Sequence, residues 1–263
     1  ANIKAVSLIP KDNEVLTSSD LVLDWDCLEK TLNKNTKAII LNTPHNPSGK
    51  VFSRKELERL AKILKSYPDC LVISDEVYEH LTYDGVEHVS IASIEGMYER
   101  TLSIFSSGKT FSATGWKVGW VIGDSRLIKR LQLCQQWVVF SVSTPHQEAI
   151  ANSLIEAKKP YKDSKSYFDW LKDLYEKKRK ILFEGLKECG LNPILPEGSF
   201  FILCDISNQE FENICPEYIK KWNEEGLISV DENTYNSKDY NFCRQLSNES
   251  KVTSIPISAF YTQ

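Results

Sequence analysis

The sequence predicts an α/β protein: a three-layer, mostly parallel sheet followed by a smaller α+β domain. Three apolar runs, centred near residues 39, 72 and 103, carry this prediction. Roughly 30 residues separate neighbouring runs, and helical patterns lie between them, as in βαβ units with right-handed crossovers. A long helical pattern later in the chain is typical of a helix that bridges two domains. We therefore place the large domain at 1–168 and the small domain at 169–263.

The first part of the chain begins with a β-like run at residues 3–9, which ends at Pro10. Asp24 then stands in N-cap position before a helix-like segment. Residues 38–41 form a continuous apolar run, the pattern of a parallel strand buried on both faces. A turn-rich loop with two prolines and a glycine follows this strand.

The next elements repeat the alternation of helix and strand. Ser53 and Glu56 match a capping box, and the apolar residues behind them recur at helical spacing. Residues 71–73 form the next buried strand, which ends in Ser-Asp-Glu at 74–76. Residues 101–105 and 120–122 are predicted as two further strands, joined by a loop of small and hydroxylated residues.

Beyond this sheet the pattern becomes more helical. An amphipathic helix is predicted over 125–139, and a longer one over 166–188, with Gly190 where a C′ glycine belongs. Residues 199–204 and 253–257 are predicted as strands. The polar segment at 207–240 has weak periodicity, and we interpret it as an insertion or a loop.

Composition excludes several classes of protein. The 263 residues are 41% hydrophobic and carry a formal net charge of −4, which argues against binding to nucleic acid or an anionic membrane. No apolar run is long enough to span a bilayer, and no signal peptide is visible. The seven cysteines are scattered without a C-x-x-C pair. This favours reduced, mostly buried thiols over a disulfide framework or a metal site, so we expect a cytoplasmic protein, with a mitochondrial location left open.

Polar clusters follow the carboxyl ends of three predicted strands, at residues 42–46, 75–78 and 106–109. In open α/β sheets, ligands bind in the crevice beyond these ends. The three clusters should therefore converge on one pocket.

Lys109 and Asp75 are the reactive candidates in these clusters. A lysine is usually a solvated surface charge, but Lys109 is packed among small residues, where partial desolvation favours the neutral amine that Schiff-base formation needs. Asp75 is either a helix N-cap or a buried carboxylate that faces a cationic partner.

The remaining candidates could hold an anion and a ring. Ser106, Ser107 and Lys117, with the N–H groups of their loop, could bind a phosphate. Asn46 is by default a turn asparagine, and Tyr78 an ordinary packed aromatic, but a helical turn would bring Tyr78 near Asp75. A Schiff-base lysine, a carboxylate, an anion cradle and a phenol together match pyridoxal phosphate.

The motifs then show a specific resemblance. The segments NTPHNPSGKVFS, VISDEVYEHLTYDG, HVSIASIEGMYERT, SIFSSGKTFSATGWKVGWVIG and SFFI resemble those of class I aminotransferases of the fold-type I pyridoxal-phosphate superfamily. Within this family the similarity is greatest to the kynurenine aminotransferase group, which includes glutamine transaminase K and cysteine-conjugate β-lyase. The match is continuous from about residue 38 to 140 and looser over the rest of the chain.

The resemblance implies a role for each candidate residue. Lys109 would attach the cofactor covalently and Asp75 would pair with its pyridinium nitrogen. Asn46 and Tyr78 would hydrogen-bond the ring oxygen, and Ser106 and Lys117 would bind the phosphate. In addition, Phe140 would reach across a homodimer interface toward the neighbouring active site, and Phe200 and Phe201 would line the substrate pocket.

The activity implied is transfer of an amino group from an aromatic, sulfur-containing or glutamine-like amino acid, with kynurenine among the candidates, to a 2-oxo acid. The alternatives are β-elimination from cysteine conjugates, or a pseudoenzyme that keeps the fold. Family members carry a phosphate-binding turn and a ring-stacking aromatic before the segment matching residue 1, and a carboxylate-binding arginine after the segment matching 253–257. We therefore expect this chain to be a fragment or a divergent member.

Overall fold

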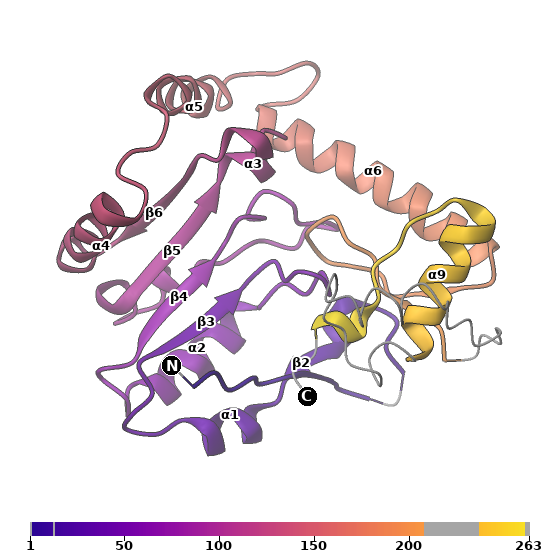
Figure 1. The fold of residues 1–263 in the computed structure, drawn as a ribbon, viewed down its shortest axis with the longest axis horizontal. Coiled ribbons are helices and arrows are strands. Elements are labelled where there is room, and N and C mark those ends of the chain that lie inside the picture. The colour runs from indigo at the N-terminus through magenta and orange to yellow at the C-terminus, as the bar shows by residue number, and fades with distance from the viewer. Residues whose placement is uncertain (1, 13, 208–236, 261–263) are drawn as a thin grey trace, which may run out of the picture. The chain divides into compact units, whose positions relative to one another are not determined.

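The central element of the computed structural model is a sheet of four strands, shown in Figure 1. The structure describes residues 2–12, 14–207 and 237–260. The sheet has the order β3-β4-β5-β6, with bounds Ala38–Asn42, Leu71–Asp75, Thr101–Ser106 and Gly119–Gly123. The first three strands are parallel and β6 is antiparallel to β5. The predicted mostly parallel α/β sheet is confirmed, and the carboxyl ends of β3, β4 and β5 share one edge.

Helices α1 (Trp25–Thr31) and α2 (Arg54–Leu64) begin where local sequence predicts. Asp24 Oδ1 accepts a hydrogen bond from Cys27 N at 2.9 Å and so caps α1. At α2, Ser53 and Glu56 form both bonds of the capping box. These bonds satisfy N–H groups that a helix leaves free at its first turn.

The main hydrophobic core lies between these helices and one face of the sheet. Most of its buried members come from α1, α2, β3, β4 and the segment before β5, and three others lie beside these elements in the sequence. The full set is Leu28, Leu32, Leu41, Phe52, Leu57, Leu60, Ala61, Leu64, Cys70, Val72, Ile91, Ile94 and Met97. The helical spacing predicted for α2 is confirmed, because its apolar residues are the buried ones.

The apolar run of β3 predicted a strand buried on both faces, and this prediction is wrong. Leu41 is buried, but Ile40 is 76% exposed. An apolar run cannot distinguish one covered face from two, because side chains alternate across the sheet whatever covers them.

Four further helices follow along the chain: α3 (Ser107–Thr110), α4 (Ser125–Val138), α5 (Thr144–Glu156) and α6 (Tyr167–Glu188). Helices α4 and α6 confirm the prediction, and Gly190 has φ 77° at the end of α6. Helix α5 was not predicted; its apolar residues give only a weak stripe, and Ile150 alone among them is buried. None of the helices in the described ranges is long and apolar enough to cross a membrane.

Short elements complete the chain up to residue 205. Strands β1 (Leu8–Pro10) and β2 (Leu21–Leu23) pair in antiparallel fashion, so only the end of the predicted run at 3–9 is a strand. Single turns of 3-10 helix are η1 (Ser18–Asp20), η2 (Ile91–Ser93), η3 (Tyr98–Arg100) and η4 (Thr114–Trp116). The described residues also include the two-residue strands β7 (Asn192–Pro193) and β8 (Cys204–Asp205).

The predicted strand at 199–204 is wrong for most of its length, since only Cys204 belongs to a strand. Its first residue, Ser199, has φ 63°, which no strand tolerates, and its N–H donates to Leu81 O at 2.9 Å. Tertiary contacts thus bend a segment whose composition favours extension.

The chain divides into two compact units, 1–204 and 205–263. The second contains α9 (Lys238–Ser250) and η5 (Ile257–Phe260), so the strand predicted at 253–257 is wrong. Residues 208–236, most of the predicted insertion, lie outside the described residues. The domain boundary at 168–169 stays a prediction.

The cysteines differ from the prediction in exposure. All six that the structure describes are free thiols, but only Cys70 is buried, while Cys134 and Cys189 are exposed. The expectation of mostly buried thiols is therefore wrong.

Candidate active site at the carboxyl ends of the strands

Asn42 joins the loop after β3 to the end of β4. Its Nδ2 donates to Asp75 O at 3.0 Å, and its Oδ1 accepts from Asn46 N at 2.7 Å. Asn42 and Asp75 are also register partners in the sheet. The predicted convergence of the first two clusters is confirmed. Sequence reasoning gave Asn42 no role of its own, although its place at a strand end was a usable signal.

Asp75 ends β4 as a half-buried carboxylate. Its Oδ1 accepts from Val77 N at 3.3 Å, and residues 77–80 form turns, so the alternative of a helix N-cap is wrong. Burial raises the pKa of Asp75 above its usual range; the Val77 N–H opposes this, the neighbouring Glu76 adds to it, and the Lys109 ammonium opposes it. A carboxylate in this position gains from a cationic partner.

Tyr78 is buried beside Asp75. The sequence predicted this position for a chain that turns directly after the strand. Burial, and next the charge of Asp75, raise the pKa of Tyr78 to about 12, while a hydrogen bond with the Asn46 side chain lowers it. The phenol therefore keeps its proton at neutral pH. Asn46 itself is exposed at the tip of its loop.

Lys109 sits in α3, the short helix that follows β5. Three bonds brace this helix: Ser107 Oγ donates to Val118 O at 2.6 Å, Thr114 Oγ1 to Gly108 O at 3.1 Å, and Tyr167 OH to Thr110 O at 3.0 Å. A Cβ at Gly108 would lie 2.8 Å from Thr114 Cα, so glycine is required before the lysine. These bonds fix the backbone from which the long side chain of Lys109 extends.

Two aromatic rings lie near the Lys109 amine. Its Nζ lies 5.9 Å from the ring centroid of Tyr78 and 5.5 Å from that of Phe200. Tyr78 packs edge-on against Phe200 at 5.1 Å and against Phe201 at 6.0 Å. The structure thus brings both phenylalanines from a segment more than 90 residues downstream to the strand ends.

A cavity of about 200 Å³ adjoins these rings on the side of α6. Its walls are largely aromatic and aliphatic, with two cationic side chains: Tyr83, Tyr175, Lys178, Arg179, Leu182, Pro196, Ser199, Phe200, Phe201 and Ile202. Its size and lining suit a flat apolar group.

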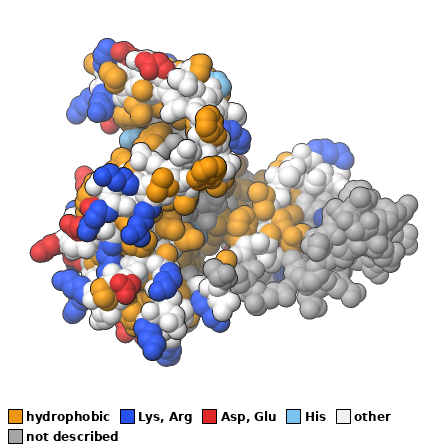
Figure 2. Space-filling model, turned by 60° about the vertical axis from the view of Figure 1, so that its left-hand side comes forward, with side chains coloured by type: hydrophobic (Ala, Val, Ile, Leu, Met, Phe, Trp, Pro, Cys, Tyr) orange, Lys and Arg blue, Asp and Glu red, His pale blue; other side chains and the backbone are white. Residues whose placement is uncertain are grey.

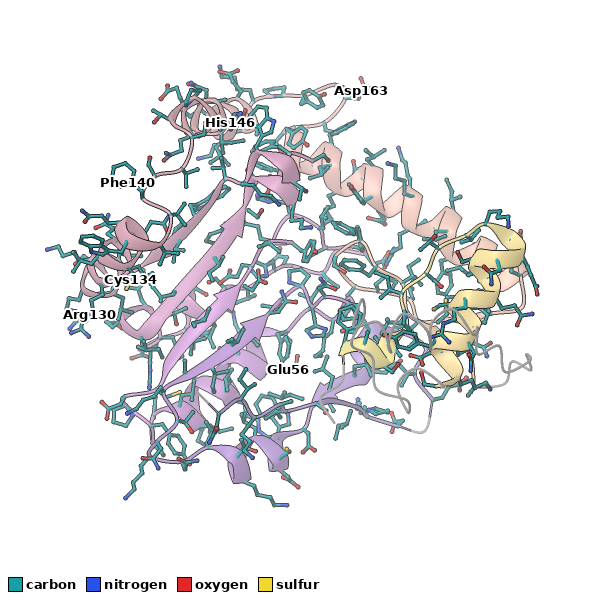
Figure 3. All side chains as sticks on the ribbon, viewed as in Figure 1. Glu56, Arg130, Cys134, Phe140, His146 and Asp163 are labelled. Atoms are coloured by element: carbon teal, nitrogen blue, oxygen red, sulfur yellow. The ribbon has the colours of Figure 1, made fainter. Side chains whose placement is uncertain are left out.

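The other predicted residues are Ser106, Lys117 and Phe140. Ser106 is half-buried at the end of β5, and Lys117 is exposed with φ 55° directly after η4. Phe140 is 81% exposed in the connection between α4 and α5, away from the carboxyl ends of the strands in Figure 3. The parallel strands therefore bring Asn46, Asp75, Tyr78, Ser106 and Lys109 to one edge, while Phe140 stands apart.

The chain is similar in sequence and in structure to known aminotransferases. A family model described as aminotransferase class I and II matches residues 8–263. Kynurenine–oxoglutarate transaminase 3 from Homo sapiens is 44% identical over 244 residues, which are 93% of this chain and 50% of the relative. Kynurenine–oxoglutarate transaminase 1 from Homo sapiens is 40% identical over 260 residues, 98% of this chain and 58% of the relative. The crystal structure of Bna3p from Saccharomyces cerevisiae superposes with a TM-score of 0.83 at 34% identity, covering 97% of this chain and 57% of that one. The chain thus spans about half the length of the proteins it matches.

Proposed function

Because this chain belongs to the class I and II aminotransferase family, we propose that the protein is a pyridoxal-phosphate-dependent transaminase. Its amino donor would be an aromatic, sulfur-containing or glutamine-like amino acid, kynurenine among them, and its acceptor a 2-oxo acid; the transaminase names of the relatives support this choice. The observation that carries the proposal is the meeting of Lys109, Asp75 and Tyr78 at the carboxyl ends of parallel strands.

The residues present fit pyridoxal phosphate. Lys109 offers an amine for its aldehyde, and Asp75 a carboxylate, with a pKa raised by burial, that needs a cation such as a protonated pyridine. Tyr78 and Asn46 offer hydrogen bonds for the ring oxygen, and Ser106 and Lys117 a hydroxyl and a cation for the phosphate. When bound, this cofactor supplies an electron sink for the bond that breaks at the substrate's α carbon.

Each side chain then has a defined task. Asp75 would pair with a protonated pyridine nitrogen and so keep its positive charge. Tyr78 keeps its proton, since its pKa is about 12, and would donate a hydrogen bond oriented by Asn46. Lys109 Nζ would carry a proton to and from the substrate's α carbon, because the braced α3 helix leaves its side chain free to swing.

The aromatic surroundings would serve binding and the exclusion of water. Phe200 and Phe201 flank Tyr78 and border the cavity, whose lining would accept an aromatic or thioether side chain. A dry site strengthens the charge interactions of Asp75 and Lys109.

We also propose a homodimer, in which Phe140 reaches the partner's site. The end of α4 supports this, because Leu133 is 63%, Trp137 85%, Val138 80% and Phe140 81% exposed. In Figure 2, hydrophobic side chains at the surface lie among charged and polar ones, and the exposed fractions above define the apolar group at the end of α4. Apolar groups gathered in this way mark contact surfaces more often than free ones.

The test is covalent loading of the full-length protein with pyridoxal phosphate. We expect a visible absorbance band on reconstitution, stable to gel filtration, that is lost in Lys109→Ala. Lys129→Ala, which removes an exposed lysine on α4, is the matched control and should keep the band. A wild-type protein that stays colourless, or a band that survives in Lys109→Ala, would refute the proposal.

A further inference from the structure

A buried acidic group lies immediately behind Asp75. Glu76 is 1% exposed, and its carboxylate is held at both oxygens. Oε2 lies 2.7 Å from His88 Nε2, and Oε1 accepts from Ser90 Oγ at 2.8 Å. These partners lie 12 and 14 residues downstream, in the connection between β4 and β5.

Glu76 is charged in this environment. Burial alone would raise the pKa of Glu76, but the hydrogen bond and charge of His88 and the bond from Ser90 hold it below its usual range. An unpartnered buried carboxylate is costly, and apolar residues of similar size would fill the space at least as well. Stability of the core therefore does not account for a glutamate here, which points to a role for its position or charge.

The geometry links Glu76 to the site through one peptide unit. Glu76 N donates to Ile104 O at 2.9 Å, on the β5 side. Asp75 O accepts from Asn42 Nδ2 at 3.0 Å and from Thr43 N at 3.1 Å, on the β3 side. Neighbouring side chains at a strand end point in opposite directions. Anchoring Glu76 behind the sheet therefore fixes the direction in which Asp75 emerges in front of it.

We propose that Glu76, held by His88 and Ser90, is a positioning residue that fixes the Asp75 carboxylate and sets its negative potential. The effect of Glu76 on cofactor binding rests on the proposed function. Its effect on the position and charge of the Asp75 carboxylate does not. Burial is the largest cause of the raised pKa of Asp75; the charge of Glu76 adds to the rise, and the Lys109 ammonium opposes it. Glu79 and His80, the other titratable groups that interact with His88, lie on the turn after Tyr78.

The first experiment is a double-mutant cycle on the full-length protein, read as the Kd of pyridoxal phosphate. We expect His88→Ala to raise this Kd about tenfold when Asp75 is present and less than twofold in an Asp75→Ala background, because coupled residues are not additive. Ser90→Ala, a milder change, should show the same pattern at about threefold. Equal factors in both backgrounds would overturn the proposal, since a purely structural role acts regardless of Asp75.

Met97→Ala is the matched control for lost stability. Met97 is 2% exposed in the main core, so its truncation lowers the melting temperature. We expect its effect on the Kd to be the same with and without Asp75. A coupling to Asp75 as large as that of His88 would overturn the assignment to Glu76 and its partners.

The second experiment needs no cofactor. The carboxyl carbon of Asp75, labelled with ¹³C and assigned with Asp75→Asn, is titrated by NMR in the ligand-free full-length protein. We expect Glu76→Gln to lower the pKa of Asp75 by removing the adjacent charge, while Glu58→Gln, an exposed change on α2, leaves it unchanged. An unaltered titration in Glu76→Gln would overturn the proposal. A wild-type protein that binds no pyridoxal phosphate would instead overturn the proposed function, and this titration would still decide the role of Glu76.

Discussion

The carboxyl group of Glu79 tests how burial and neighbouring charges shift pKa values next to the candidate active site. Its side chain is 28% exposed, and its Oε1 lies 3.5 Å from His80 Nε2. Burial raises the pKa of Glu79 to about 7 from an ordinary value of 4.5; the charge of His88 opposes this rise and that of Glu76 adds to it. We predict that Glu79→Gln stabilises the protein, and that the gain depends on pH.

The sign and size follow from proton linkage. The folded state holds the Glu79 proton more tightly than the unfolded state, so stability falls as the pH rises from about 4.5 to 7. Each pH unit between these values is worth about 1.4 kcal/mol, which gives a total of about 3 kcal/mol. Glutamine never ionises and escapes this cost. The gain should therefore be below about 1 kcal/mol at pH 5 and about 3 kcal/mol at pH 8.

The assay is urea unfolding or calorimetry of the full-length protein and Glu79→Gln at pH 5, 6, 7 and 8. At pH 8 the gain corresponds to a rise in melting temperature of about 6–12 °C. His80, whose pKa burial and next His88 lower to about 4, makes stability rise between pH 4 and 6.5. At pH 5 residue 79 is uncharged in both proteins, and at pH 8 His80 is neutral in both, so the effect of His80 cancels at these two pH values. Glu95→Gln, an exposed change, should give no pH-dependent gain. A gain that is the same at pH 5 and pH 8, or none at pH 8, would refute the reasoning.

Three further predictions concern other parts of the chain. Burial and the charge of Lys50 lower the pKa of His45 to about 4, so stability is lost as the pH falls from 6.5 toward 4. His45→Gln, which can keep a bond to Ser48, should reduce this loss of melting temperature by several degrees in calorimetry. An unchanged fall in melting temperature over this pH range would contradict the prediction. Asp75→Ala should keep the absorbance band of covalently bound cofactor but lower turnover at least about 100-fold in an assay of 2-oxo acid formation, and undiminished turnover would show that the carboxylate has no part in the chemistry. Ser53→Ala should cost about 1 kcal/mol of unfolding free energy, because it removes the cap of α2, and equal denaturation midpoints would count against that cap.

Much of the fold could be predicted because the signals are local. The Ser53–Glu56 capping box, the Asp24 cap and Gly190 concern bonds or backbone angles within a few residues, and each is observed. The spacing of the apolar runs predicted three parallel strands because a βαβ crossover has a minimum length. The meeting of the polar clusters followed from that topology, which puts all three carboxyl ends at one edge.

The errors occur where distant contacts override composition. Residues 199–204 favour a strand, but Ser199 bonds to Leu81, and the segment turns toward Tyr78. Ile40 has the apolarity of a buried residue, yet its exposure depends on what covers its face of the sheet. The residues next to Ser199 and Ile40 in the sequence predict neither outcome.

The sequence by itself determined the parallel strands of the core and which side chains stand at their carboxyl ends, because helix caps, strand periodicity and crossover length are short-range properties. Only the tertiary structure decided how that edge is held: Asn42 bridging Asn46 and Asp75, Phe200 closing over Lys109, and Glu76 anchored to His88 and Ser90. These bonds join residues that are adjacent in space and separated along the chain. Their geometry depends on the packing of the whole unit and therefore cannot be predicted from any single segment of the sequence.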